Sequence, residues 1–248
     1  ELLEKKKYLS NLLNNRRLLL ETLIEELKHL KQKFNVKRKT KILKDINQEQ
    51  ASSDAINWFE NKLNQTIEDI NNSYDKYRIS EALMTTYKLI WDDFCSIYLE
   101  IIKPDYQKPI DRKTYNKTIN FLENILKLLH PFMPFLTEEI WHSIKDRNDD
   151  IIVASWPELN SYNKELIISF EKTMEVVSGV RNIRKEKNIA KKELLELNVI
   201  EHEKNEYDLN SIILKLGNLS QLKYIEKKID NSFSFMVKSN EYLSLIHI

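Results

Sequence analysis

One run of residues settles where two long helices must end and begin: Leu128-Leu129-His130-Pro131-Phe132-Met133-Pro134-Phe135-Leu136-Thr137-Glu138-Glu139-Ile140-Trp141. Proline lacks an amide hydrogen and clashes with the carbonyl four residues earlier, so no helix passes undisturbed through both Pro131 and Pro134. The residue before each proline is pushed towards extended geometry. The run therefore predicts a helix that ends near His130 and a second that begins between Pro134 and Thr137. Between them we expect a buried structural elbow, with Trp141 packed in the core.

Apolar residues recur with helical spacing on both sides of this elbow. We expect helices over residues 56–78, 79–103, 113–130, 134–145 and 164–188, and a short extended segment over 151–157. After residue 190 the apolar period changes to two, which is typical of half-buried strands. The expected elements there are strands over 195–199, 221–226 and 233–238, and a helix over 207–216 with Gly217 just past its end.

These elements predict a mostly α fold, namely an antiparallel helical bundle with an N-terminal coiled-coil helix and a small C-terminal α/β unit. The expected divisions are a basic coiled-coil helix and linker (1–47), the helical bundle (48–190), the α/β unit (191–242) and a tail (243–248). The tail fits no pattern before it and resembles the translated end of a sequencing adapter, so we expect it to lie outside the fold.

Composition excludes several classes of protein. The chain of 248 residues has two glycines and no Gly-rich phosphate-binding motif, so it does not bind nucleotides by those devices. It has one cysteine, Cys95, which rules out an internal disulfide and a cysteine-based zinc site. No apolar run reaches the roughly 18 residues that a membrane helix needs. We therefore expect a cytoplasmic protein with no membrane partner.

Positive charge is concentrated in two places although the net charge is only +1. Residues 1–47 hold 13 lysines and arginines against six acidic residues, and residues 181–192 hold six against one. Basic patches of this kind can bind the phosphates of nucleic acids. The alternative is a solvated helix face with no ligand.

Catalytic arrangements are not apparent in the sequence. Asp92 and Asp93 are adjacent, so on a helix their side chains point about 100° apart and cannot act as paired carboxylates. His130 lies in the apolar elbow, where a core or capping role is the simpler interpretation. No metal-ligand spacing, nucleophile motif or triad is present, so we expect neither a catalytic nor a metal site.

Residues 48–242 resemble the C-terminal region of valyl-tRNA synthetase, a class I aminoacyl-tRNA ligase. The resemblance is carried by five segments: 55–59 (AINWF), 77–83 (YRISEAL), 91–95 (WDDFC), the elbow 128–141, and 181–189 (RNIRKEKNI). The elbow motif is shared by synthetases for branched aliphatic amino acids, and the last segment favours valine.

This resemblance implies an anticodon-binding helical bundle followed by the small α/β unit, with the tRNA for valine as partner. It implies that the parent ligase uses ATP and Mg²⁺. The class I catalytic signatures and the editing domain do not occur in the sequence, so we expect a fragment that is inactive alone and holds no cofactor. RNA loops are bound by stacked and hydrogen-bonded bases and by basic groups on phosphates. The expected tRNA-binding residues are Arg78, Arg181, Arg184, Lys185 and Lys187; for Arg78, an ion pair with Glu81 or Asp75 is the alternative.

A second resemblance covers residues 9–42. The segments 25–34 (EELKHLKQKF) and 38–42 (RKTKI) are similar to the coiled-coil arm of the DNA gyrase and topoisomerase IV A subunits. This resemblance implies DNA binding or self-association through residues 1–42, and a chimera joined between Thr40 and Gln48. A helical scaffold with no nucleic-acid role is a third alternative.

Overall fold

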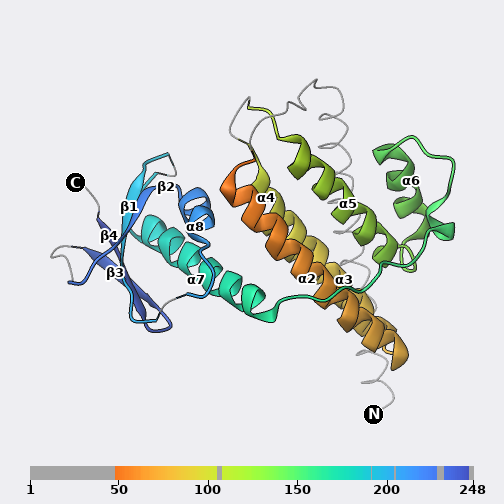
Figure 1. The fold of residues 1–248 in the computed structure, drawn as a ribbon, viewed down its shortest axis with the longest axis horizontal. Coiled ribbons are helices and arrows are strands. Elements are labelled where there is room, and N and C mark those ends of the chain that lie inside the picture. Colours follow the sequence, from red (N-terminus) through yellow and green to blue (C-terminus); the bar gives the residue numbers. More distant parts are fainter. Residues whose placement is uncertain (1–47, 105–107, 191, 204, 228–231, 246–248) are drawn as a thin grey trace, which may run out of the picture.

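The computed structural model describes residues 48–104, 108–190, 192–203, 205–227 and 232–245. The coiled-coil helix expected within residues 1–47 lies outside the described residues. Within them the fold is mostly helical with one small mixed sheet, as the sequence predicts (Figure 1). No helix in these ranges is both long and apolar enough to span a bilayer.

The α-helices follow the predicted order closely. They are α2 (Gln50–Asp75), α3 (Ile79–Lys88), α4 (Leu99–Ile102), α5 (Arg112–Leu129), α6 (Pro134–Ile144), α7 (Lys164–Glu186) and α8 (Asn210–Gly217). Two other helical segments were not predicted. A π-helical segment, η1 (Leu89–Tyr98), joins α3 to α4, and a 3₁₀ turn, η2 (Ile151–Val153), replaces the start of the extended segment expected over 151–157.

The elbow forms where the two prolines predict it. The last residue of α5 is Leu129, and Pro134 occupies the first turn of α6, where its missing N–H costs nothing. The expectation that the whole elbow is buried is wrong, however. Trp141 is 7% exposed, but Pro131 and Pro134 face solvent and Phe135 is 90% exposed. In the first turn of α6 only Thr137 is buried, so one face of that turn is covered and the other is open to solvent.

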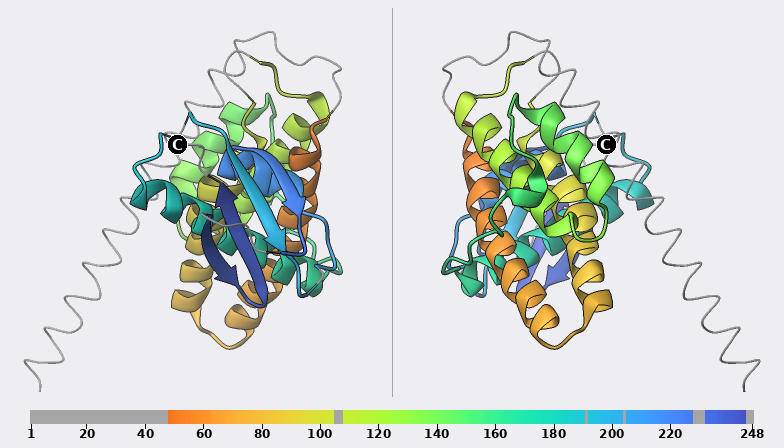
Figure 2. Two further views of the ribbon diagram at one scale, coloured as in Figure 1. Left: turned by 90° about the vertical axis from the view of Figure 1, so that its left-hand side faces the viewer. Right: turned by 90° about the vertical axis from the view of Figure 1, so that its right-hand side faces the viewer.

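The core of the helical part is built around α2. Its apolar stripe, predicted from spacings of three and four, is buried along its whole length. Phe59 lies at the centre of an aromatic cluster with Phe94, Tyr98 and Phe121, with ring centroids 4.9–5.3 Å from its own. Aromatic pairs at such distances add about 0.5–1.5 kcal/mol beyond the area they bury. Figure 2 shows α2 and α3 running side by side to their shared turn.

The C-terminal unit is a four-stranded sheet in the order β2-β1-β4-β3, made of β1 (Leu195–Ile200), β2 (Leu219–Tyr224), β3 (Phe233–Val237) and β4 (Asn240–Leu245). β1 and β2 are parallel and joined through α8, whereas β4 is antiparallel to both of its neighbours. In Figure 1 the sheet lies at one end of the molecule, beside α7 and α8.

Two sequence expectations fail in this unit. Residues 243–245 do not lie outside the fold, because they complete β4, where Leu243 is fully buried. Read without the strands that pair with them, the six residues of β4 give no sign that they form an interior strand of the sheet. Gly217 is the last residue of α8 and not the residue beyond it; Asn218 takes the left-handed position, with a φ of 51°. Asparagine is one of the few residues other than glycine that tolerates this conformation.

Candidate nucleic-acid interface

The basic segment expected to contact tRNA forms the C-terminal end of α7. The helix stops there because Asn188 adopts a left-handed conformation with a φ of 52°. The amide of Ile189 then donates to the Arg184 carbonyl at 2.9 Å, and that of Asn188 to the Lys185 carbonyl at 3.3 Å. These two bonds are the closing pattern of a helix C-terminus. They fix the direction in which the basic side chains leave the helix.

A groove of roughly 1090 Å³ lies between this end of α7 and the C-terminal ends of α4 and α8. Its lining is strongly basic, with Lys103, Arg181, Arg184, Lys185 and Lys215 against a single acidic residue, Glu100. Three of the predicted tRNA-binding residues therefore come together on one surface. Lys103 and Lys215 were not among the predicted residues, because they are distant in sequence and only the packing of the helices brings them here.

Helix dipoles account for part of this charge. The carbonyl end of a helix carries a partial negative charge, which favours lysine and arginine in its last turn. Lys103 caps α4, Lys185 lies in the last turn of α7 and Lys215 in that of α8. Lys103 also pairs with Glu100 at 3.6 Å, and Lys215 pairs with Glu49 at 2.6 Å. Arg181 lies a turn earlier on α7 and is exposed, so it adds positive charge beyond what the helix ends require.

Arg184 has a different environment from its neighbours. Its side chain is buried, and its guanidinium donates to the carbonyls of Gly217 at 3.0 Å, Asn218 at 2.9 Å and Ala190 at 3.2 Å. Burial lowers the pKa of this guanidinium, and nearby Glu193 opposes that shift. In this conformation the guanidinium is not available to tRNA, because it ties the end of α7 to the turn between α8 and β2.

A signal for the burial of Arg184 was present in the sequence. It continues the apolar stripe of Val177 and Val180 with spacings of three and four, and both valines are buried. Residues with that spacing share one face of a helix. Lys185 and Lys187 lie off this face and are exposed. The Lys187 ammonium lies 3.9 Å from the centre of the Phe233 ring in β3, a cation–π contact.

Arg78 is not part of this groove. It precedes α3 at the turn after α2, which lies at the opposite end of α2 from α8 in both figures. Of the alternatives raised by the sequence, the structure shows the ion pair: the Arg78 Nη1 atom lies 3.4 Å from the Glu81 Oε2 atom. Both side chains are more than half exposed, so the pair contributes little to stability. The guanidinium remains on the surface.

Tyr77, beside Arg78, was not singled out by the sequence analysis. It is 90% exposed and has a φ of 56°, a conformation that is unusual for a bulky side chain. The strain arises because Tyr77 occupies the position after the end of α2, where glycine or asparagine is preferred. The sequence predicts that the helix continues to Arg78, but α2 ends at Asp75, and the ring of Tyr77 faces solvent.

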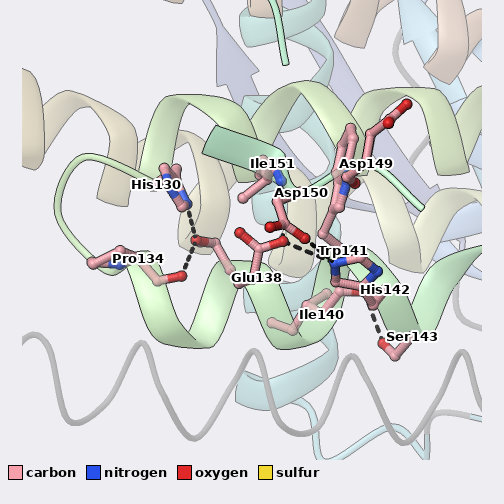
Figure 3. A network of polar contacts seen from close by, with 11 residues as sticks. His130, Pro134, Glu138, Ile140, Trp141, His142, Ser143, Asp149, Asp150 and Ile151 are labelled. Atoms are coloured by element: carbon pink, nitrogen blue, oxygen red, sulfur yellow. Dashed lines mark hydrogen bonds and ion pairs between the residues drawn. The ribbon is translucent and has the colours of Figure 1, made fainter. Parts of the chain in front are cut away.

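The elbow holds two helices together through buried Thr137, whose hydroxyl contacts His130 and the Pro134 carbonyl, two residues labelled in Figure 3. The Thr137 hydroxyl oxygen lies 2.9 Å from the Met133 carbonyl and 2.7 Å from His130 Nδ1. Since the hydroxyl donates its hydrogen to a carbonyl, it accepts from His130, and Nδ1 carries the proton. The core or capping role expected for His130 fits this geometry, because His130 is the C-cap residue of α5 and is partly buried. Trp141 is fixed by a hydrogen bond from its indole N–H to the Asp149 carbonyl at 3.1 Å.

Asp93 lies in the middle of η1 and lines a cavity of roughly 690 Å³ with Lys62 and Glu171. Burial raises the pKa of its carboxyl to about 6, and Lys62 opposes the shift. π-Helical turns are rare and are often found at functional sites. The sequence analysis considered Asp93 only as one member of a carboxylate pair and gave no sign of this environment.

Comparison with known proteins gives a consistent result. Residues 57–200 match the family model described as the anticodon-binding domain of tRNA ligase. The chain is 44% identical over 211 residues to the valine–tRNA ligase of Christiangramia forsetii, which covers 84% of the chain and 24% of the relative. It is 45% identical over 199 residues to the valine–tRNA ligase of Parabacteroides distasonis, a match that covers 79% of the chain and 23% of the relative. It is 34% identical over 177 residues to the valine–tRNA ligase of Thermotoga maritima, a match that covers 69% of the chain and 20% of the relative. The chain thus spans about a quarter of the length of these relatives, and none of these matches supports the topoisomerase alternative.

Proposed function

Because this chain belongs to the anticodon-binding domain family of tRNA ligases, we propose that it is the tRNA-binding part of a valine–tRNA ligase. The observation that carries the proposal is the family match over residues 57–200, which includes both helices of the elbow and all of the basic end of α7. The parent ligase would join valine to its tRNA in the cytoplasm, with ATP and Mg²⁺ bound in its catalytic part. Helices α2 to α7 would act as the antiparallel bundle that the sequence predicts.

The basic groove is the proposed contact for the tRNA backbone. Arg181, Lys185 and Lys187 are exposed cations within seven residues of one another, and the walls of the groove add Lys103 and Lys215. Phosphate contacts by such groups supply affinity without reading sequence. Arg184 is not included, because its guanidinium already has three carbonyl partners. Its proposed role is to hold the groove in shape.

The turn between α2 and α3 is the proposed contact for an unpaired base. Tyr77 presents an exposed ring beside the exposed guanidinium of Arg78. Aromatic and guanidinium planes are the groups on which splayed bases of RNA loops stack. The strained backbone of Tyr77 supports this role, since a glycine would fit the turn with less strain but could not stack.

Binding of a fluorescent anticodon stem-loop of the valine tRNA, measured across a series of salt concentrations, tests the groove. We expect Arg181→Ala and Lys185→Ala in the groove, and Lys187→Ala beside it, each to weaken binding and to lower the slope of log K against log salt by about 0.7–0.9. Lys172→Ala is the matched control, because Lys172 is on α7 but pairs with Glu203 at 3.3 Å, away from the groove. If the control and the groove variants change binding equally, the groove is not the contact.

The same assay separates stacking from phosphate contact. Replacing Tyr77 with alanine should weaken binding by about 1–3 kcal/mol, the usual value of one stacked base, and leave the salt slope unchanged. Tyr224→Ala is the control, because Tyr224 is also an exposed tyrosine but lies on β2. An affinity of the Tyr77→Ala protein equal to that of the unmodified chain would remove this turn from the interface.

A further inference from the structure

Three potential metal ligands converge beside the elbow. Glu138 and His142 lie one turn apart on α6, and Asp150 follows on the loop before η2. The Nε2 atom of His142 is 3.0 Å from the Glu138 Oε1 atom and 3.1 Å from the Asp150 Oδ1 atom. Figure 3 shows both carboxylates directed at the same imidazole nitrogen. The three ligand atoms all lie within 4.8 Å of one another.

The loop that carries Asp150 is held on both sides of that residue. The indole N–H of Trp141 donates to the Asp149 carbonyl at 3.1 Å, and the amide of Ile151 donates to Glu138 Oε1 at 3.0 Å. Both bonds connect the loop to α6, which supplies the other two ligands. The Trp141 bond fixes the loop without using a ligand atom, whereas the Ile151 amide also orients Glu138 Oε1, one of the three ligand atoms.

The charge of the cluster calls for a cation. An imidazole carries at most one positive charge, so it cannot offset both carboxylates. The nearest lysine and arginine in the sequence, Lys145 and Arg147, are both directed to Glu123, each at 2.6 Å. The Arg147 guanidinium also lies 3.7 Å from the centre of the Trp141 ring. Both of these cations are directed to Glu123, so neither of them offsets the second carboxylate of the cluster.

We propose that Glu138, His142 and Asp150 bind a divalent transition-metal ion, with Zn²⁺ as the best match. Zinc bonds of about 2.0–2.2 Å to nitrogen and oxygen place tetrahedral ligands about 3.4 Å apart, so the two nitrogen–oxygen separations of 3.0 and 3.1 Å need to widen by only a few tenths of an ångström. An imidazole ligand favours zinc and related ions over Mg²⁺ and Ca²⁺, which prefer oxygen. A water molecule would complete the coordination, because Asp150 is largely exposed.

Such an ion would clamp the loop before η2 onto α6. The sequence analysis found no metal-ligand spacing, because a glutamate and a histidine four residues apart are common on helices and the third ligand comes from a loop. The site is separate from the proposed basic groove: α6 lies at the end of the molecule away from α8 and the sheet (Figure 1).

Calorimetric titration of the 248-residue chain with ZnCl₂ tests the proposal. We expect one site per chain whose Kd is raised at least about tenfold in each of Glu138→Gln, His142→Ala and Asp150→Asn. Glu139→Gln and Asp149→Asn are matched controls, because they remove a neighbouring carboxylate but no proposed ligand, and they should keep the site. MgCl₂ should not compete with Zn²⁺.

Thermal unfolding gives a second measurement, which can be made on a variant that keeps His142. Zn²⁺ binding only to the folded chain raises its Tm, and this shift should be lost in Asp150→Asn, whose exposed position leaves the fold intact. A Zn²⁺ affinity and a Tm shift that are the same in all five variants and in the unmodified chain would overturn the proposal. Such a result would mean that Glu138 and Asp150 only form ion pairs with His142 and that the three residues do not bind a metal ion.

Discussion

At the scale of single residues, Arg184 shows how a basic residue can serve the fold. Its guanidinium donates to three backbone carbonyls: that of Ala190 after α7, that of Gly217 at the end of α8 and that of Asn218 in the α8–β2 turn. Hydrogen bonds that involve a charged group are worth about 1.5–3 kcal/mol, and removal of one partner leaves the other buried and unpaired. The tRNA contact expected for this residue from the sequence is therefore replaced, in our proposal, by a structural role.

The first prediction concerns this role. Arg184→Ala should lower the free energy of unfolding by roughly 2–3 kcal/mol, measured by urea denaturation. Lys185→Ala, a change at the adjacent exposed residue, should alter it by no more than about 0.5 kcal/mol. Equal stability of the two variants would contradict the structural assignment.

The second prediction concerns Asp93, whose folded pKa is raised to about 6 from an ordinary value of 3.8. Between these two values the unfolded chain releases the proton while the folded chain keeps it. Stability therefore falls as pH rises through this window, and the loss is complete above the folded pKa. Asp93→Asn cannot ionise, so it should be more stable than the unmodified chain at neutral pH, by up to about 3 kcal/mol.

Urea denaturation at about pH 4, 5, 6 and 7 measures this difference. The advantage of Asp93→Asn should grow with pH and level off near neutrality. Asp92→Asn, at the exposed neighbouring position, is the control and should show no such growth. An advantage of Asp93→Asn that is the same at every pH would mean that the carboxyl does not titrate in this window.

At the scale of elements, the sequence is informative where a local rule acts. Two prolines locate the elbow to within one residue, and spacings of three and four identify the buried stripe of α2. The other elements are determined by contacts with parts of the chain that are distant in sequence. The π-helical η1 is indistinguishable by spacing from an α-helix, and β4 is recognisable only once β1 and β3 lie on either side of it. The sequence predicts only one wall of the groove, because the basic residues of α7 are close together in the chain. Lys103 and Lys215 are distant in sequence, and only the packing of α4, α7 and α8 brings them to the groove.

The third prediction tests the elbow. Thr137→Val keeps the shape of the side chain but removes the hydroxyl that joins His130 to the start of α6. We expect a loss of about 1–2 kcal/mol in the free energy of unfolding. In a double-mutant cycle with His130→Ala the two losses should fail to add, with a coupling energy of at least about 0.5 kcal/mol. Strict additivity would show that the bond between them contributes nothing.

The fourth prediction tests how α7 packs on the sheet. A methyl group at Gly179 would lie 2.2 Å from the ring of Phe235 in β3, so Gly179→Ala forces that ring to move and disturbs its stacking on Tyr242. We expect a net loss of about 1 kcal/mol, since overpacking outweighs the better helix propensity of alanine.

In a Phe235→Ala background the clash is absent. The same substitution should then raise stability by up to about 1 kcal/mol, the propensity gain alone. Thermal or urea unfolding of the four proteins measures both values. A Gly179→Ala effect with the same sign in both backgrounds would show that Phe235 does not cover this glycine.

At the scale of the whole molecule, the helical part and the sheet share α7. Phe170, near its start, stacks on Trp58 of α2 at 3.8 Å, whereas Val176 and Val180 belong to the core beneath the sheet. The N-terminal end of α2 is joined to α8 by Lys215 with Glu49 at 2.6 Å and by Ser211 with Asp54 at 2.5 Å. The proposed groove is therefore built by both parts, and in our proposal the sheet unit would contribute to tRNA binding by positioning one wall of the groove.

The fifth prediction addresses the central claim, that this chain recognises the anticodon arm of the valine tRNA. The most direct measurement is the Kd of the 248-residue chain, at one fixed salt concentration, for two stem-loops that share a stem and differ only in the anticodon. Contacts to bases are worth about 1–3 kcal/mol each, so we predict that the stem-loop with the valine anticodon binds at least about tenfold more tightly. Equal affinity for the two stem-loops would contradict the account, because it would show that the chain contacts phosphates and does not read the anticodon.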